Sequence, residues 1–362
     1  MKFDRYIHRA LLPILLIGWG WLLAACSDHT DPTEDQPEPQ IGSMLRIGSL
    51  TRSDSSTDPF EGGAEVKLFL VPQGPQGAAA KEPGIVKKDD SSGDIIWNGN
   101  PLMVKPGADY SIFGFLPAAV TKGASAVTVD EANSQATMTI HDLPAVTSQD
   151  LCVIIGVKEG RLSANESVTP GTFAYHAPEN TAEDYYVSLL ADHLYAGVTF
   201  KFYIDPTYDA LRTIKLKKVE MKSTSKMMNV SIPLNMNNEG NNPIGTPTYT
   251  ATETAQADVT LYQSQQSQGE ALTLATANTP LTFTAYFSPG VQTGLSIVST
   301  YDVYDKDGHL VSENRKAENS LAAPLAGVLR GQKGIITLTV NPTYLYILSN
   351  WDINNPEFVI TN

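Results

Sequence analysis

The sequence has little of the material from which metal and catalytic sites are usually built. Its 362 residues include two cysteines and six histidines. No His-Glu-x-x-His motif is present, and no histidine after residue 40 lies within four residues of another histidine or cysteine, so we predict no zinc site. A Gly-x-Ser-x-Gly elbow, a phosphate loop and a dinucleotide fingerprint are also missing. We therefore predict that the chain is not an enzyme and needs no cofactor or metal. A carboxylate pair for glycoside hydrolysis stays open, because such a pair is spaced in the fold and not along the sequence.

Cysteine is restricted to Cys26 and Cys152. If Cys26 carries lipid, Cys152 has no partner, and neither an intramolecular disulfide nor a cysteine metal site is expected. Cys152 stands in the apolar run at residues 151–155, where we predict a small buried hydrophobe in a core strand. The chain must then be held by its own core, which its length permits.

Positive charge and long apolar runs are both scarce. Lys and Arg number 25 against 39 Asp and Glu, which gives a net charge of −14. This balance is unfavourable for binding nucleic acid or anionic lipid through charge. After the N-terminal run at residues 10–23, no apolar stretch is long enough to cross a membrane.

The N-terminal segment has the layout of a secretory signal. Three basic residues among the first nine precede the apolar run, which ends in Leu23-Ala-Ala-Cys26. This ending resembles the bacterial lipobox, whose cysteine is diacylated and becomes the first mature residue. The resemblance implies that Cys26 carries lipid such as palmitate, which anchors the protein in the cell outer membrane. A plain secretory signal and a retained membrane helix are the alternatives, but a short run broken by Pro and Gly spans a bilayer poorly.

The next segment is predicted to be a tether. We expect residues 1–25 to be the signal peptide and residues 26–42 an acidic, Pro-rich linker. Residues 27–40 contain acids, Pro and polar side chains with no apolar position, so they cannot build a core and are expected to be disordered.

From residue 41 onward, short β-type runs alternate with turn clusters. We predict strands at residues 65–71, 95–97, 102–104, 109–115, 136–140, 151–157, 193–204, 212–221, 281–287, 294–304, 334–340 and 344–348. In residues 65–71 the apolar side chains alternate, as in a half-buried strand. Asp205-Pro206 predicts a capped helical turn, and Asp307-Gly308 predicts a hairpin in preference to a calcium loop. This pattern indicates an all-β chain with two tandem antiparallel β-sandwiches, at residues 43–190 and 191–362.

Several of these features together resemble the fimbrillin family, the lipoprotein-derived type V pilins. They are the lipobox, the acidic tether, the segments at 44–52, 65–71 and 193–202, and a C-terminal strand pair that ends near Trp351. The resemblance implies two transthyretin-like sandwiches and a pilus subunit that contributes to adhesion. It also implies that a trypsin-like protease cuts after an arginine near the first strand, which removes that strand and opens a groove for the C-terminal strand of another subunit.

The resemblance supplies candidate residues for this scheme. Strand exchange is physically reasonable, because an added strand pairs with the open backbone edge and fills the apolar groove. The candidate cleavage points are Arg46 and Arg52, which could also be ordinary exposed arginines. The candidate donor residues, which could also belong to an ordinary last strand, are Tyr344, Tyr346, Leu348 and Trp351. The implied partners are other pilin subunits and the outer membrane.

Two other functions stay open from the sequence. A surface carbohydrate-binding lipoprotein would present aromatic side chains to sugars, and the candidates for this are Trp97, Tyr175, Tyr185 and Tyr186. A glycan hydrolase is less favoured because no motif points to one.

Overall fold

The computed structural model describes residues 42–54, 64–74, 80–180, 185–237, 240–241, 243–264, 271–276 and 278–340, and the backbone of residues 345–350. All of them belong to one compact unit that spans Ile41–Asn362. The predicted signal peptide, nearly all of the predicted tether and Cys26 lie outside the described residues. Within the described ranges, no helix has the length and apolar character that a membrane span requires.

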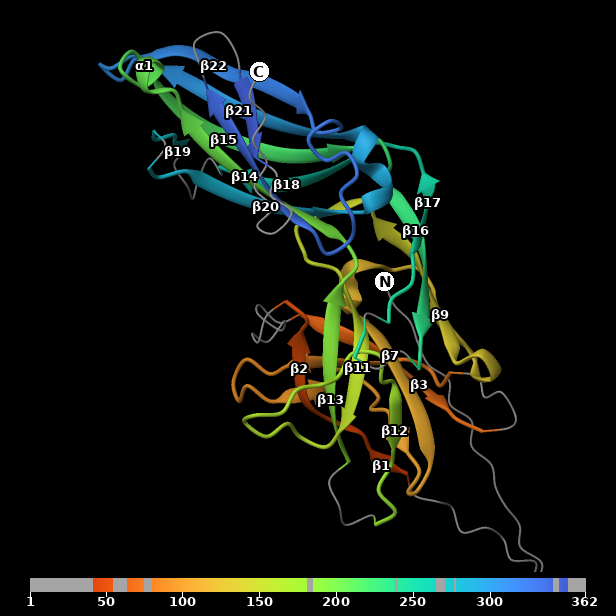
Figure 1. The fold of residues 1–362 in the computed structure, drawn as a ribbon. Helices are drawn as coiled ribbons and strands as arrows, with labels where there is room; N and C mark the ends of the chain where they lie inside the picture. Colours follow the sequence, from red (N-terminus) through yellow and green to blue (C-terminus); the bar gives the residue numbers. More distant parts are fainter. Residues whose placement is uncertain are drawn as a thin grey trace, which may run out of the picture. The chain divides into compact units, whose positions relative to one another are not determined.

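The largest sheet contains the first long strand at one edge (Figure 1). Its order is β2 (Arg46–Arg52), β13 (Tyr186–His193), β11 (Cys152–Glu159), β7 (Asp109–Leu116), β3 (Glu65–Pro72), β4 (Gly84–Lys88) and β5 (Ile95–Trp97), with β12 (Ala174–His176) also on β7. A short pair joins β1 (Ser43–Met44) to β6 (Met103–Val104).

Three further sheets are present in the described residues. One has the order β10 (Val146–Thr147), β20 (Leu281–Phe287), β14 (Ala196–Ile204), β23 (Lys333–Val340) and β24 (Leu345–Asn350). Another has the order β18 (Ala257–Gln263), β15 (Thr213–Ser223), β21 (Leu295–Tyr304) and β22 (Leu310–Ser320), with β19 (Leu272–Thr273) on β15. The last has the order β17 (Thr248–Glu253), β16 (Met227–Asn235), β9 (Gln135–Pro144) and β8 (Ser125–Asp130). The short helices are α1 (Pro206–Asp209), η1 (Ala118–Val120), η2 (Glu131–Asn133) and η3 (Pro289–Gly294).

The predicted all-β, sandwich-type class is confirmed, and most strand pairs are antiparallel as expected. Two pairs depart from this pattern, because β2 runs parallel to β13 and β14 runs parallel to β23. In both cases the partners are far apart in the sequence, so no hairpin connects them and their local residue patterns carry no sign of the pairing.

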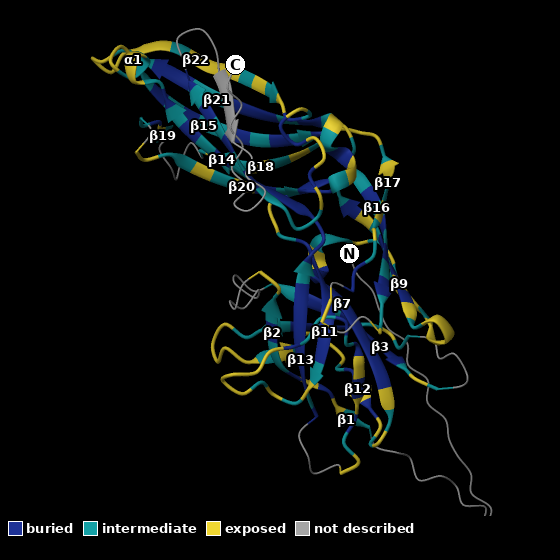
Figure 2. Cartoon of the chain, in the orientation of Figure 1, coloured by how far each residue is buried: buried dark blue, intermediate teal, exposed yellow. Residues whose placement is uncertain are grey.

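Two hydrophobic clusters lie on opposite faces of the largest sheet. Its central strands β3, β7, β11 and β13 are mostly buried and are coloured dark blue in Figure 2. In β3, Leu68 and Leu70 face one cluster, whereas Phe69 and Val71 face the other. The prediction of a half-buried strand holds for Glu65–Leu68, where buried and partly exposed residues alternate, but it was wrong for Phe69–Val71, where both faces are buried. The reason is that layers pack on both sides of this sheet, so its central strand becomes apolar on both faces.

Local predictions are borne out at three positions. The carboxylate of Asp205 caps α1, accepting the N–H groups of Thr207 and Tyr208 at 2.9 and 3.1 Å. The predicted hairpin connects β21 to β22, with Gly308 at φ +86°. Cys152 is buried in β11.

The predicted domain boundary between residues 190 and 191 stays a prediction. β9 and β10 precede this boundary, and they pair with β16 and β20 after it.

Candidate functional site: the edge strand β2

β2 closes one edge of the largest sheet and covers part of its core. Its backbone pairs with β13 from Tyr186 to Ala191, and the two strands lie side by side in Figure 1. Leu45, Ile47 and Leu50 are 0%, 6% and 3% exposed and belong to one hydrophobic cluster. Burial of each such side chain is worth roughly 1.5–3 kcal/mol relative to exposure. β2 is therefore held by both backbone pairing and apolar contact.

The N-terminal end of β2 is held by hydrogen bonds to the backbone. The indole Nε1 of Trp97 donates to the carbonyl of Leu45 at 2.8 Å. The N–H of Leu45 donates to the carbonyl of Leu102, and that of Arg46 to the carbonyl of Tyr185, at 3.0 and 2.7 Å. These contacts join β2 to three separate segments.

Arg46 lies against an arginine–tyrosine stack. Its Nη1 donates to the hydroxyl of Tyr186 at 3.3 Å, and its guanidinium lies 5.7 Å from the centre of that ring. Arg161 donates to the same hydroxyl and stacks on the ring at 3.9 Å. Hydrogen bonds from both arginines lower the pKa of Tyr186.

A groove of about 650 Å³ lies between β2 and the segment at residues 93–97, which includes β5. It is lined by Met44, Arg46–Thr51, Gly93–Trp97, Arg161 and Tyr186. We call this the β2 groove. Of the aromatic residues considered for sugar binding, Trp97 and Tyr186 line it. Tyr175 and Tyr185 are only 1% and 3% exposed, so that expectation was wrong for them, because both side chains are packed into the core.

The C-terminal end of β2 reaches a cluster of charged side chains from four segments of the chain. We call this the β2 end cluster, and it comprises Arg52, Asp54, Asp150, Asp192, His193, Arg330 and Lys333. The Nη1 of Arg52 lies 3.3 Å from Asp150, and its Nε lies 3.3 Å from Asp54. The side chain of Arg52 is 23% exposed.

His193 lies at the centre of this cluster. Its Nδ1 is 2.8 Å from Asp150, and its Nε2 is 2.8 Å from Asp54, which also pairs with Lys333 at 2.8 Å. Burial lowers the pKa of His193, but the hydrogen bonds to Asp150 and Asp54 outweigh it and raise the pKa above its usual value. Burial raises the pKa of Asp54, but Lys333 and His193 outweigh it and hold this pKa well below its usual range.

The predicted processing and donor residues fall on different sheets. Arg46 begins β2 and Arg52 ends it, so the two arginines delimit the strand. Tyr346 and Leu348 belong to β24, which pairs with β23 at the edge of another sheet. Tyr344 and Trp351 lie outside the described residues.

The residue pattern did not predict the β2 end cluster. Asp150, His193 and Lys333 are separated by 43 and 140 positions. The pairing of β2, β11 and β13 brings the first two to the end of β2, and the pairing of β23 with β14 brings Lys333 there. The only sequence feature that pointed to this cluster was His193 beside an apolar run. A core histidine with its hydrogen bonds satisfied gives the same pattern, so this feature does not identify a cluster.

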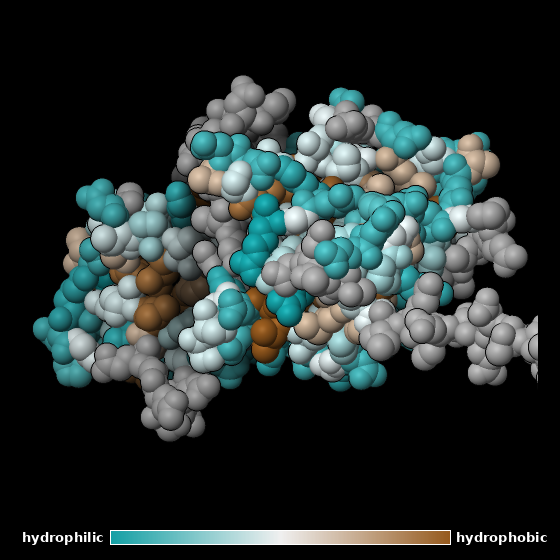
Figure 3. Space-filling view, turned by 90° about the horizontal axis from the view of Figure 1, so that it is seen from below, coloured by the Kyte–Doolittle hydropathy of each residue, from teal (hydrophilic) through white to brown (hydrophobic). Residues whose placement is uncertain are grey.

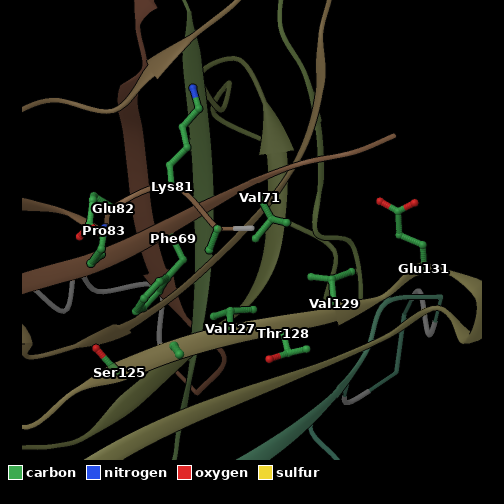
Figure 4. A pocket seen from close by; sticks show the side chains of 12 residues that line it. Phe69, Val71, Lys81, Glu82, Pro83, Ser125, Val127, Thr128, Val129 and Glu131 are labelled. Carbon is green, nitrogen blue, oxygen red and sulfur yellow. The ribbon is translucent and has the colours of Figure 1, made fainter. Parts of the chain in front are cut away.

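A second hollow, of about 460 Å³, lies between β3 and the edge strand β8. In the close-up, Phe69 and Val71 of β3 face Val127 and Val129 of β8, and Lys81 stands at the rim (Figure 4). On the face shown in Figure 3, the coloured surface is mostly hydrophilic or intermediate, with hydrophobic residues gathered in a few patches.

Comparison with known proteins gives matches only among solved structures, since no protein-family model and no curated protein matches the chain. It is similar to a candidate cell adhesion protein from Bacteroides uniformis, with 11% identity over 84% of this chain and 96% of that one, at a TM-score of 0.43. A fimbrial protein from Bacteroides vulgatus gives 11% identity, coverage of 83% and 97%, and a TM-score of 0.40. The fimbrial anchor protein Mfa2 from Porphyromonas gingivalis gives 11% identity, coverage of 83% of this chain and 94% of that one, and a TM-score of 0.29. These neighbours are proteins of the kind that the sequence resembles, but similarity at this level assigns no function.

Proposed function

We propose that the chain is a cell-surface adhesion protein of the fimbrial type, and that it is a pilus subunit assembled by strand exchange and not an enzyme. The observation that carries this proposal is the position of β2. It is an edge strand, it is delimited by two arginines, and it covers apolar core residues.

Removal of β2 would create an acceptor site for another strand. The backbone groups of β13 that pair with β2 would lose their partners, and Val187, Leu189 and Ala191, all 0% exposed, would lose their cover on that side. An unpaired edge beside apolar side chains is a template for strand addition from another chain.

The position of the cut decides whether this acceptor opens. A cut after Arg46 leaves the following six residues of β2 attached to the body of the protein. A cut after Arg52 frees the whole strand, whereas Asp54 stays with the body through His193 and Lys333. We therefore propose Arg52 as the processing site that permits assembly.

The C-terminal strand is the proposed donor. β24 lies at the edge of its sheet, where it pairs with β23 along Ile336–Val340. Tyr346 and Leu348 alternate along it and would place bulky side chains into the acceptor. In this scheme Cys26 first anchors the subunit to the outer membrane, and the lipid leaves with β2 when Arg52 is cut.

Limited digestion with trypsin tests the proposal. The parent protein should lose its N-terminal segment through Arg52 and form multimers by size-exclusion chromatography. Arg52→Ala should be trimmed at Arg46 and remain monomeric, whereas the matched variant Arg46→Ala should be trimmed at Arg52 and multimerise. Multimers of trimmed Arg52→Ala equal to those of the parent would show that this site is not the one that matters.

Glycan binding at the β2 groove is a second candidate function. The groove combines the aromatic side chains of Trp97 and Tyr186 with the guanidinium groups of Arg46 and Arg161. Aromatic faces pack against sugar rings, and guanidinium forks recognise carboxylates. An acidic sugar would therefore suit this groove.

The two functions are separable, because β2 forms one wall of the β2 groove. Glycan-array binding by the uncut chain should fall in Tyr186→Ala and should vanish after trimming at Arg52. Binding that survives the loss of β2 would place any glycan site elsewhere.

A further inference from the structure

Cys152 and His193 are directly opposed residues in the ladder between β11 and β13. The Sγ of Cys152 lies 3.6 Å from the Nδ1 of His193, and the two residues are 1% and 2% exposed. Both carboxylate oxygens of Asp150 face the same ring nitrogen, at 2.9 and 2.8 Å. A sulfur, a nitrogen and a carboxylate thus meet at one buried point.

We propose that Asp150, Cys152 and His193 bind one zinc ion. The sequence predicts no metal site, because Cys152 and His193 are distant in the chain and are brought together only by the ladder between β11 and β13. In a tetrahedral zinc site, a Zn–S bond of about 2.3 Å and a Zn–N bond of about 2.0 Å place sulfur and nitrogen about 3.5 Å apart. The separation of 3.6 Å between Cys152 and His193 fits this value. The carboxylate of Asp150 lies closer to the Nδ1 of His193 than two ligands of one zinc ion would. It must move away from this nitrogen by about 0.5 Å to admit the ion.

The donor set selects the metal. Thiolate and imidazole together favour zinc over calcium or magnesium, which take oxygen ligands. Asp150 lies in the connection between β10 and β11, two residues from the ladder, where a shift of its side chain does not break strand pairing. It can supply one oxygen and leave a fourth position to water, or supply both oxygens.

Two charged residues outside the donor set already hold it in place. The Nε2 of His193 contacts the carboxylate of Asp54 at 2.8 Å, which is the partner that a zinc-bound imidazole usually has on its distal nitrogen. The guanidinium of Arg52 contacts Asp150. Nδ1 is thereby left as the nitrogen that faces the sulfur and the carboxylate.

Zinc would be held by the thiolate of Cys152, the neutral imidazole of His193 and the carboxylate of Asp150, so the Sγ–H proton of Cys152 leaves when the ion binds. The negative charges of the thiolate and the carboxylate match the two positive charges of the ion. This match avoids adding uncompensated charge to a buried site.

The test uses the full chain with Cys26→Ser, so that Cys152 is the only thiol. After equilibration with zinc and desalting, elemental analysis should give one zinc per chain. When cobalt is used as the probe, the protein should show a thiolate-to-metal absorption band in the near ultraviolet. Added zinc should displace the cobalt and remove this band. Cys152→Ala should lose both the bound zinc and the cobalt band.

Further variants keep the test decisive if Cys152→Ala misfolds. Asp150→Asn, with folding checked by circular dichroism, should bind zinc at least tenfold more weakly. Asp54→Asn should weaken binding by about 10–100-fold, as loss of an outer partner does. The control His309→Ala alters the exposed Asp305–Asp307–His309 group and should leave zinc binding unchanged.

The proposal is overturned if the parent retains no zinc and shows no thiolate band. It is equally overturned if zinc binding is the same in Cys152→Ala and Asp150→Asn as in the parent.

Discussion

Single side chains hold the two ends of β2 in different ways. At its N-terminal end, a neutral hydrogen bond from Trp97 reaches the carbonyl of Leu45. At its C-terminal end, ion pairs join Arg52 and Asp54 to other segments. The first kind of contact is little affected by salt, whereas partly exposed ion pairs weaken as salt screens them. The strand is therefore expected to loosen first at the end where we propose the cut.

Trp97→Phe tests the contact at the N-terminal end. The substitution keeps an aromatic ring but removes the donor to the carbonyl of Leu45, so the free energy of unfolding should fall by about 1 kcal/mol. Urea denaturation measures this change. An unchanged unfolding midpoint would mean that the indole N–H does not contribute to holding β2.

Glu166 gives a prediction about pH. The backbone N–H of Ser163 and the ammonium of Lys158 lower its pKa from an ordinary value of 4.5 to about 2. Because the folded pKa is depressed, the stability that Glu166 contributes is present above about pH 4.5 and is lost as the pH falls towards 2. An NMR titration of the Glu166 carboxyl should have its midpoint near 2.

The same titration in Lys158→Ala separates the two causes. The hydrogen bond from Ser163 is the larger one, so the midpoint in the variant should stay below 4.5. A midpoint near 4.5 in the parent would contradict this assignment.

At the scale of elements, residue pattern accounts for most strands but not for their pairing. Alternation predicted β14, β20 and β23 because one face of each is more deeply buried than the other. β16 also alternates, but Pro233 lies within it, and a proline within an apolar run argues against a strand. The parallel neighbour of β2 could not be predicted, because backbone pairing between distant segments leaves no mark on their composition.

Gly114 tests how tightly the central strands pack. A Cβ at this position in β7 would lie 2.5 Å from the carbonyl oxygen of Lys67 and 2.8 Å from Leu68 Cδ2. Gly114→Ala should therefore destabilise the fold by about 1–3 kcal/mol, as overpacking does.

Gly197→Ala is the matched control within β14. Its Cβ would first meet the flexible side chain of Lys333 at 3.2 Å, so the cost should be smaller. Thermal unfolding of both variants decides the comparison. Equal losses would show that backbone crowding at Gly114 is not the cause.

At the scale of the whole molecule, the two candidate processing arginines and the β2 end cluster lie at the same edge strand. Sequence resemblance supplied Arg46 and Arg52, and the fold shows that they bound an edge strand. The cluster that holds the end of this strand could not be predicted, since it draws on Asp54, Asp150, His193 and Lys333 from distant parts of the chain. Charged residues become partners only through tertiary pairing.

The central claim is that loss of β2 opens an acceptor that another subunit fills. A synthetic peptide with the sequence of residues 43–54, added in excess to protein trimmed at Arg52, measures this directly. The peptide should refill the edge of β13 and suppress multimers in size-exclusion chromatography, whereas a scrambled peptide should leave them unchanged. Multimers that form equally well with the β2 peptide present would contradict assembly at this edge.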